Sequence, residues 1–423
     1  MNTYGIIILG TILLSYVLDL VADLLNLKAL KPDLPSEFHD VYNAEAYQKS
    51  QTYERVTTRF GFMTSTFGLA LTLVFWFAGG FNWLDQLVRS WGLHAIINGL
   101  VYMAILTLAR TLLSMPFSVY STFVIEERFG FNRTTPKTFV LDLVKGLALS
   151  IVIGAPILAG VLAFFQYAGS YAWLYCWIAM TIVSLILQFV APTWIMPLFN
   201  KFTPLEDGEL RESILAYAQS VNFPLQNLCV MDGSKRSNKS NAFFTGFGRN
   251  KRIALFDTLI EKHTIPELVA VLAHEIGHYK KKHILKSMLF SIMHSGVMFF
   301  LLSIFMNHAG LFEAFYMQEM SIYAGLIFFG MLYAPIELIL SIFLQIYSRK
   351  NEYEADRFAV DTYEHPQAMI DGLKKLAKDN LSNLTPHPVY VFLNYSHPPM
   401  LQRIEAIRRI EAIRQIPLNQ SGE

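Results

Sequence analysis

The chain has 423 residues, of which 53% are hydrophobic, and its mean hydropathy is +0.36. This composition is too apolar for an ordinary soluble enzyme and is typical of a polytopic membrane protein with a sizeable polar part. A formal net charge of +1 gives no reason to expect a nucleic-acid partner. The two cysteines, Cys176 and Cys229, lie in an apolar segment and in a predicted strand, so we expect both to be structural and not joined by a disulfide.

Seven apolar stretches are long enough, or nearly so, to cross a bilayer, which requires roughly 20 residues per helix. The predicted spans cover residues 5–24, 62–81, 96–115, 145–167, 171–190, 286–306 and 322–347. The first is expected to be a retained span and not a signal peptide, because no basic region or cleavage site accompanies it. We therefore expect a mainly α, multi-pass integral membrane protein with the lipid bilayer as a partner.

The distribution of Lys and Arg predicts how these spans are oriented. Five such residues fall in the loop 25–61 and three in the loop 116–144, whereas the loop 82–95 has one and the loop 307–321 has none. The two basic loops should therefore face the cytoplasm. The N-terminus then lies outside, and the polar regions before the sixth span and after the seventh lie in the cytoplasm.

Four ionisable residues fall inside the apolar stretches, where a charge is costly and usually faces protein or water. They are Asp19, Asp23, Arg110 and Glu337. One interpretation is a wet chamber between the helices. The other is that these side chains reach the membrane interface from positions near helix ends, which is easy for Asp23 and harder for Arg110 and Glu337.

The main candidate for chemistry follows the fifth span. Residues 264–283 are predicted to form a helix, in which His274 and His278 stand four positions apart and share one face. Two imidazoles placed in this way can bind one zinc ion, and Glu275 can take a proton from a water on that ion. Three fixed residues also recur by chance in proteins without metal, so this motif alone leaves metal binding open.

A catalytic zinc site requires three protein ligands and one open position. The third should be a carboxylate or imidazole on another element, and Glu352 is well placed, 74 residues beyond His278 (352 − 278) in a helical pattern that continues from the seventh span to residue 359. Asp356 is one turn further and can accept a hydrogen bond from a ligating imidazole. Glu354 points roughly 200° away from Glu352 and should face other protein or solvent. Without the histidine pair, these acidic residues would indicate only a solvated charged helix face.

The region between the fifth span and the histidine helix is predicted to hold a helix and several strands. Residues 203–222 are expected to form an amphipathic helix and Leu228–Asp232 a short strand. Residues 237–257 are expected to form two strands joined by a turn at 248–250. Such a hairpin can offer an edge to an extended peptide, which would add as another strand. Alternatively, the hairpin only packs against the helix.

The histidine motif and the acidic motif together resemble those of the type I CAAX prenyl proteases, which are seven-span zinc metallopeptidases. The segments that carry the likeness are His274–His278, Asn351–Asp356, Ile125–Asn132, Pro197–Phe202, Ser240–Ala242, Lys251–Thr258 and Ser396–Pro399. The likeness covers nearly the whole chain. Related heat-shock membrane proteases share the two metal motifs but have fewer spans, so seven spans favour the CAAX group.

This resemblance implies a barrel of seven transmembrane helices around a large chamber. A gluzincin-like metalloprotease domain, which contains the small β-hairpin or sheet, would lie at its cytoplasmic end. The resemblance also implies one zinc ion per chain, with His274, His278 and Glu352 as its ligands and Glu275 as the catalytic base.

Four further residues take roles from the same resemblance. Asn241 and Ala242 would lie on a strand that pairs with the substrate, and His397 and Arg403 would approach the negative charge that develops during hydrolysis. Preorganised donors are worth most in a site that excludes water, so a cation there is chemically reasonable. The alternative for His397 is a structural hydrogen bond at a Pro-Pro turn.

These features divide the chain into four parts. Residues 1–195 hold the first five transmembrane helices, and residues 196–285 form a cytoplasmic metalloprotease part with the histidine helix. Residues 286–347 hold transmembrane helices six and seven, and residues 348–423 form a cytoplasmic C-terminal part with the third zinc ligand.

The predicted reaction is hydrolysis of peptide bonds near the C-terminus of peptide or protein substrates. The resemblance implies that these substrates carry an isoprenylated cysteine. The location would be the endoplasmic reticulum membrane in a eukaryote or the inner membrane in a bacterium, with the active site facing the cytoplasm. The chain ends Asn-Gln-Ser-Gly-Glu without a dilysine signal, so a bacterial protease of misfolded or membrane proteins stays open. A transporter or receptor with a structural zinc is the non-enzyme alternative.

Overall fold

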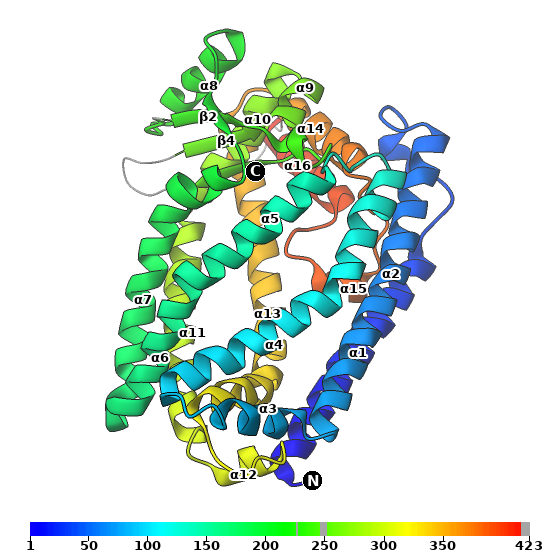
Figure 1. Cartoon of the computed structure of the whole chain (residues 1–423). Coiled ribbons are helices and arrows are strands. Elements are labelled where there is room, and N and C mark those ends of the chain that lie inside the picture. The colour runs from blue at the N-terminus through cyan, green and yellow to red at the C-terminus, as the bar shows by residue number, and fades with distance from the viewer. Residues whose placement is uncertain (226, 246–251, 416–423) are drawn as a thin grey trace, which may run out of the picture.

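The computed structural model describes residues 1–225, 227–245 and 252–415, most of which are helical. Seven helical segments among these residues are long and apolar enough to cross a membrane, which confirms the predicted fold class. Figure 1 shows them as a ring of tilted helices below a smaller mixed region. The spans are built from α1 (Thr3–Ala29), α2 (Ala44–Phe77), α4 (Ala95–Tyr120), α5 (Pro136–Leu149), α6 (Ala155–Tyr167), α7 (Ala172–Val190), α11 (His283–Phe305) and α13 (Ile322–Thr362).

Several helices extend beyond the apolar stretches that predicted them. α2 begins at Ala44, well before the predicted span at residue 62, because the side chain of Asn43 caps its first turn with a 2.8 Å hydrogen bond from the backbone of Ala46. α13 runs through Pro335 and on to Thr362, as the helical pattern after the seventh span predicted. Apolarity therefore located the spans but not their ends.

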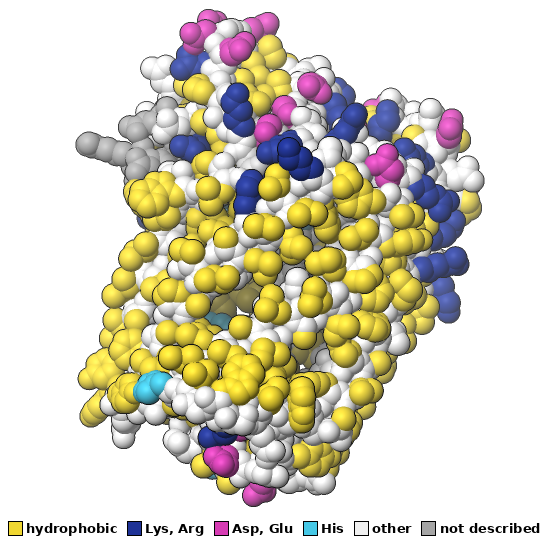
Figure 2. All heavy atoms as spheres, viewed as in Figure 1, with side chains coloured by type: hydrophobic (Ala, Val, Ile, Leu, Met, Phe, Trp, Pro, Cys, Tyr) yellow, Lys and Arg dark blue, Asp and Glu magenta, His cyan; other side chains and the backbone are white. Residues whose placement is uncertain are grey.

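The outer surface of the ring is apolar. Ile151, Val152 and Met293 are 68–70% exposed, and Figure 2 shows hydrophobic side chains over the whole middle of the molecule, with Lys and Arg gathered mainly above them. An exposed apolar surface of this extent would be unstable in water and is suited to a bilayer. The chain is thus a multi-pass integral membrane protein.

The N-terminus and the loop between the sixth and seventh spans lie at the same end of the molecule. The side chain of Asn2 donates a 2.6 Å hydrogen bond to the carbonyl of Gly310, which lies in α12 (Ala309–Glu313). The short helix α3 (Gly80–Arg89) lies at this end too, as Figure 1 shows. This grouping agrees with the Lys and Arg distribution, which predicted that the N-terminus and the loops 82–95 and 307–321 lie on the same side of the membrane.

A cavity of about 890 Å³ lies between α2, α4 and α13, and Arg110 lines it. The carboxylate of Glu337 lies 3.2 Å from Nε2 of His294, which belongs to a neighbouring span. Arg110 therefore borders a cavity, and Glu337 has a polar partner on a neighbouring span.

The described strands form one sheet with the order β1-β2-β4-β3. β1 and β2 are antiparallel, β2 and β4 parallel, and β3 and β4 antiparallel. The strands are β1 (Phe202–Pro204), β2 (Asn227–Met231), β3 (Ala242–Thr245) and β4 (Arg252–Phe256). The predicted turn at 248–250 lies outside the described residues. Within the described part of the chain, no further strand pairs with β3, so β3 is an edge strand.

Two predicted helices are shorter in the structure. The helix expected over 203–222 is α8 (Glu209–Ser220), because the residues before it pair as β1. The helix expected over 264–283 is α10 (Ile265–Lys280), which follows α9 (Asp257–Lys262). α10 ends because Lys282 adopts a left-handed conformation with φ of 60°, which an α-helix cannot contain. The chain then turns, and α11 begins.

The sheet, α10 and the C-terminal helices share one hydrophobic core. Its fully buried members include Ile253, Ala273, Ile370 and Ile407, which come from segments on both sides of the sixth and seventh spans. The C-terminal helices are α14 (Pro366–Asp379), α15 (Pro388–Asn394) and α16 (Met400–Gln415). This packing brings the end of α13 against α10, where the candidate site lies.

Candidate metal centre

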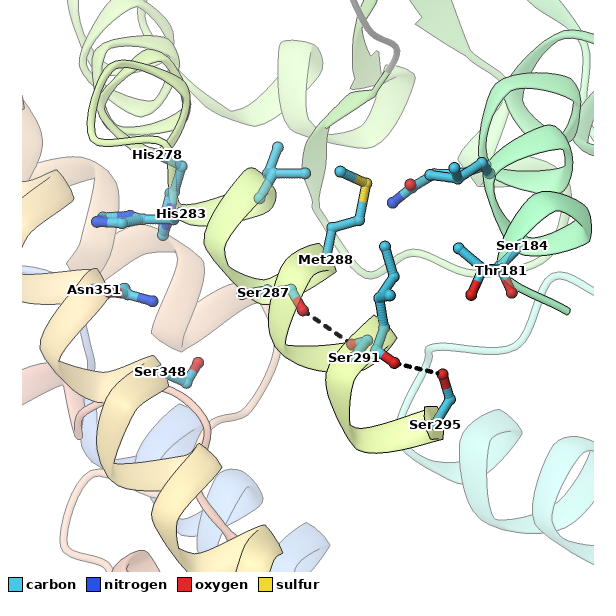
Figure 3. Close-up of a pocket in the computed structure, with 14 residues that line it drawn as sticks. Thr181, Ser184, His278, His283, Ser287, Met288, Ser291, Ser295, Ser348 and Asn351 are labelled. Carbon is cyan, nitrogen blue, oxygen red and sulfur yellow. Dashed lines mark hydrogen bonds between the residues drawn. The ribbon is translucent and has the colours of Figure 1, made fainter. Parts of the chain in front are cut away.

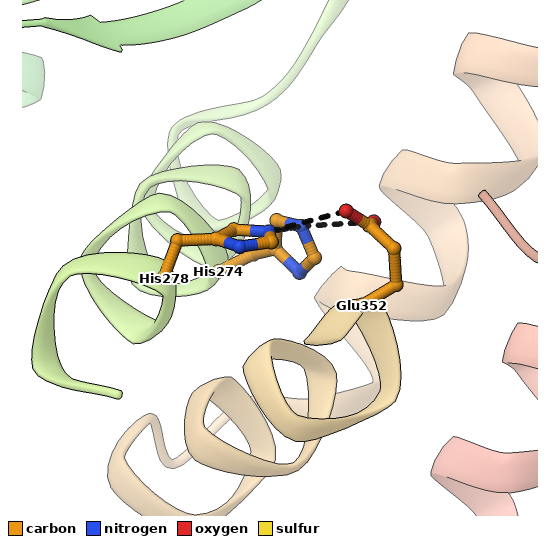
Figure 4. A group of neighbouring side chains, drawn as sticks. All are labelled: His274, His278 and Glu352. Atoms are coloured by element: carbon orange, nitrogen blue, oxygen red, sulfur yellow. Dashed lines mark hydrogen bonds and ion pairs between the residues drawn. The ribbon is translucent and has the colours of Figure 1, made fainter. Parts of the chain in front are cut away.

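Three candidate ligands converge where α10 meets the end of α13. His274 and His278 project from α10 toward Glu352 on α13, as Figure 4 shows. The two Nε2 atoms are 3.1 Å apart, and the carboxylate oxygens of Glu352 lie 3.4 Å from Nε2 of His274 and 3.3 Å from Nε2 of His278. One donor atom from each side chain thus faces a common centre.

The two helices approach closely because Gly277 has no side chain. A Cβ atom at this position would lie 3.0 Å from the carbonyl oxygen of Ala355 and 3.1 Å from its Cα. The residue between the two histidines therefore sets the distance from α10 to α13. This distance places Glu352 within reach of both imidazoles.

The donor set fits a zinc ion. Oε2 of Glu352 is buried and makes no hydrogen bond among the described residues, although Nη1 of Arg403 lies 3.5 Å from it. Two imidazoles and one carboxylate are a common ligand set of catalytic zinc, which keeps a fourth position for water or substrate. A buried carboxylate oxygen without a hydrogen bond is costly, so a cation between these groups would complete the site.

Behind His274 lies a second pair of charged groups. Nδ1 of His274 is 2.8 Å from Asp356, which is the contact that helical spacing predicted for this carboxylate. Arg403, from α16, binds Asp356 with two hydrogen bonds of 2.8 and 2.5 Å, and its guanidinium lies 3.5 Å from Glu352. All of these side chains are almost completely buried. The guanidinium therefore offsets the charge of two buried carboxylates.

These carboxylates also affect protonation of the metal-free site. Burial alone would lower the pKa of His274, but Asp356 and Glu352 outweigh it and raise that pKa to about 9. The acidic neighbours of His274 therefore favour positive charge at this imidazole.

The remaining predicted site residues surround one cavity of about 610 Å³. Glu275, Asn241 and Ala242 line it together with the candidate ligands His274 and Glu352. His397 and Arg403 line it as well, and Nε2 of His397 lies 3.4 Å from Glu352. The structure thus places every one of the predicted site residues except His278 and Asp356 at this cavity. His278 borders a second cavity on the other side of the centre.

One contact of the centre was not predicted. Glu354 faces other protein, which is one of the two surroundings expected for it. Its carboxylate lies 3.1 Å from Nε2 of His283, and Nδ1 of His283 lies 3.1 Å from Nδ1 of His278. In an unbroken helix, a residue five positions after His278 would point roughly 140° away from it. The break at Lys282 returns His283 to the site, and nothing in the sequence marked that break.

Both halves of the chain match known protein families. Residues 23–201 match the family described as CAAX prenyl protease N-terminal, five membrane helices, and residues 204–411 match peptidase family M48. The two matches join at β1, between the spans and the peptidase region.

Full-length relatives extend this result. The chain is 37% identical over 409 residues to a CAAX prenyl protease 1 homolog from Arabidopsis thaliana, with 95% of this chain and 96% of the relative covered. It is 35% identical to CAAX prenyl protease 1 from Saccharomyces cerevisiae, with 90% and 89% covered. The crystal structure of S. mikatae Ste24p superposes with a TM-score of 0.91 at 33% identity, with 96% and 99% covered. The chain therefore belongs to the CAAX prenyl protease 1 family and is a membrane metalloprotease of peptidase family M48.

Proposed function

We propose that this chain is a zinc-dependent endopeptidase that cuts peptide bonds near the C-terminus of isoprenylated CAAX-type proteins. The observation that carries this proposal is the meeting of His274, His278 and Glu352 with Glu275 at a cavity bordered by the edge strand β3. The names of the relatives support the substrate class. Family membership favours the peptidase over a transporter or receptor with a structural zinc.

The chain's own residues divide the work of the reaction. One zinc ion per chain, held by His274, His278 and Glu352, would supply Lewis-acid chemistry and acidify water. The carboxylate of Glu275, which lines the cavity, takes the proton from the attacking water and passes it to the leaving amine. Asp356 accepts a hydrogen bond from His274 and so holds that imidazole in the tautomer that binds metal through Nε2.

Arg403 and His397 supply positive charge and a hydrogen-bond donor beside Glu352. The negative charge that develops on the substrate carbonyl is stabilised by preorganised donors of this kind. Arg403 is fixed by its two hydrogen bonds to Asp356, so it requires little reorganisation during the reaction. His397 is 63% exposed on its side chain and can adjust to the bound substrate.

The substrate is bound as an added strand. β3 carries Ala242 at its start and Asn241 just before it, and both residues line the cavity that holds Glu275. An extended peptide that pairs with the edge of β3 then runs along the cavity that holds Glu275 and the candidate ligands His274 and Glu352. The cavity also has an apolar side, formed by Val271, Leu373 and Leu376, which suits aliphatic residues of the substrate.

The peptidase unit combines residues 196–285 and 348–423, while residues 1–195 and 286–347 anchor it in the membrane. The hydrophobic core shared by residues 196–285 and 348–423 supports this unit, and Phe38, Tyr42 and Tyr47, from the region after the first span, pack into the same core. The excess of Lys and Arg in the loops 25–61 and 116–144 supports a cytoplasmic active site. The membrane is that of the endoplasmic reticulum in a eukaryote and the inner membrane in a bacterium.

The test uses the purified full chain in lipid nanodiscs with three substrates. These are a farnesylated CAAX peptide, the same peptide without the isoprenoid, and an unfolded membrane protein. We expect the zinc-loaded chain to cut the farnesylated peptide after its modified cysteine, with loss of activity on chelation and recovery on zinc addition. Cleavage of the unfolded protein alone would support a quality-control protease, and no cleavage of any substrate would refute a peptidase.

A further inference from the structure

The two ring nitrogens of His278 face different partners. Nε2 points to the metal centre, 3.1 Å from Nε2 of His274 and 3.3 Å from Glu352. Nδ1 lies 3.1 Å from Nδ1 of His283, and the two rings meet edge to face with centroids 5.1 Å apart. A ligand of the centre is therefore supported from behind by a second imidazole.

His283 is itself held by a carboxylate. Its Nε2 atom lies 3.1 Å from an oxygen of Glu354, and the residue is only 3% exposed. Glu354 lies two residues after Glu352 on α13, so α13 supplies both a candidate ligand and the last member of this chain of contacts. Figure 3 shows His278 and His283 side by side at one end of a cavity of about 570 Å³.

If His278 binds a metal ion through Nε2, only one placement of the ring protons of His278 and His283 is consistent with these contacts. If Nε2 of His278 binds a metal ion, its proton must be on Nδ1, which then donates to Nδ1 of His283. Because that nitrogen accepts, the proton of His283 is on Nε2 and is donated to the carboxylate of Glu354. Each group then has a single role, and each contact has one donor and one acceptor.

We propose that His283 and Glu354 are positioning residues that fix the ring orientation and tautomer of the zinc ligand His278. This inference rests on the proposed zinc function. It also gives the two histidine ligands different support, since His274 is backed directly by Asp356 and its partner Arg403, both buried. His278 is backed through an intervening imidazole by the partly exposed Glu354.

The position of His283 depends on the break between α10 and α11. Lys282 has φ of 60°, and α11 begins at the next residue, so His283 folds back against His278. The turn is therefore part of the metal centre and not only a connection to the sixth span.

The first measurement is zinc affinity, by competition with a chelator, on the full chain in detergent. Loss of a group that orients a ligand typically weakens metal binding about 10–100-fold, and we expect this for His283→Leu and Glu354→Leu. His283→Asn, whose amide oxygen can accept from His278, and Glu354→Gln, which can still accept from His283, should recover most of the affinity. The matched control is His263→Leu, because His263 is also buried, at 7% exposure, but its hydrogen bonds go to the backbone of Leu259 and Gly372 and not to the candidate ligands.

The second measurement separates positioning from a general loss of fold. In the Co²⁺-substituted protein, His283→Leu should change the energies and intensities of the visible ligand-field bands, whereas His263→Leu should leave them as in the wild type. Wild-type zinc affinity and an unchanged Co²⁺ spectrum in His283→Leu would overturn the inference. Glu352→Ala is run in parallel, because retention of zinc by that variant would instead overturn the proposed metal site itself.

Discussion

Nδ1 of His274 lies 2.8 Å from the carboxylate of Asp356, on the side of the imidazole that faces away from the metal centre. The same helical turn of α13 carries Glu352, whose carboxylate faces the centre. One helix face therefore supplies both a candidate ligand and the group that orients another ligand. The buried Arg403 completes this arrangement by pairing with Asp356.

Removal of the charge of Asp356 should affect both metal binding and stability. Asp356→Asn can still accept a hydrogen bond from His274, but it leaves the buried guanidinium of Arg403 with only the longer, 3.5 Å ion pair to Glu352. We expect zinc affinity to fall about 10–100-fold and the Tm of the metal-free protein to fall as well. Asp361→Asn, on the exposed part of the same helix, is the control, and equal zinc affinities for the two variants would contradict the assignment.

The carboxylate of Glu275 should be needed for hydrolysis but not for metal binding. It borders the cavity of the site and is not one of the three grouped donors. Glu275→Gln should retain about one zinc per chain and lose about 10²–10⁴-fold in kcat, which is the usual contribution of a general base. Elemental analysis and peptide cleavage on the same preparation check this, and wild-type turnover by the zinc-loaded variant would exclude the proposed role.

Two nearby glutamates should differ sharply in their effect on metal content. Glu352 faces both imidazoles, whereas Glu354 contacts His283 on another side of α13. With saturating zinc, Glu352→Ala should lose the metal and all activity, while Glu354→Ala should retain about one zinc per chain at reduced affinity. Zinc analysis after gel filtration decides this, and the reverse result would mean that the helical phase around residue 352 is wrong.

The close approach of α10 and α13 should make Gly277 intolerant of a side chain. A Cβ atom there would press on the backbone of Ala355, and the helix would have to move away from Glu352. Gly277→Ala should therefore weaken zinc binding and lower Tm. Gly146→Ala is the matched control, because a Cβ atom at that helical position has no neighbour within 4 Å and should have little effect. Equal behaviour of the two variants would contradict this account.

The membrane orientation can be tested with single cysteines. In a background with Cys176→Ala and Cys229→Ala, a cysteine at Glu319 and one at Asp207 should react with an impermeant reagent from opposite sides of the membrane. Both side chains are well exposed, at 68% and 91%. Labelling of both positions from one side would refute the span count after residue 285.

The sequence predicted the spans and the shared helix faces of the candidate ligands because these depend on short-range periodicity. The meeting of Glu352 with the two histidines is a long-range contact, which the family resemblance implied. Apolar stretches located all seven spans, and the four-residue spacings 274–278 and 352–356 placed side chains on common helix faces. Element ends were predicted less well. The predicted helix over 203–222 was too long because it included β1, whose pairing with β2 is a long-range contact that no local pattern reports.

The contacts of His283 and Arg403 could not be derived from spacing for a related reason. His283 reaches the centre only through the left-handed Lys282, a conformation that lysine adopts rarely and that tertiary packing must enforce. Arg403 arrives from α16, far along the chain, and its pairing with Asp356 depends on how the C-terminal helices pack. Family resemblance indicated Arg403, but only the structure shows its partners.

The metal centre is divided along the chain by two membrane crossings. His274 and His278 precede the sixth span, and Glu352 belongs to the same continuous helix as the seventh. During synthesis, no nascent chain that stops before the seventh span can hold all three donors. A chain that stalls part-way through insertion therefore lacks the assembled candidate centre, and formation of that centre is tied to completion of the membrane topology.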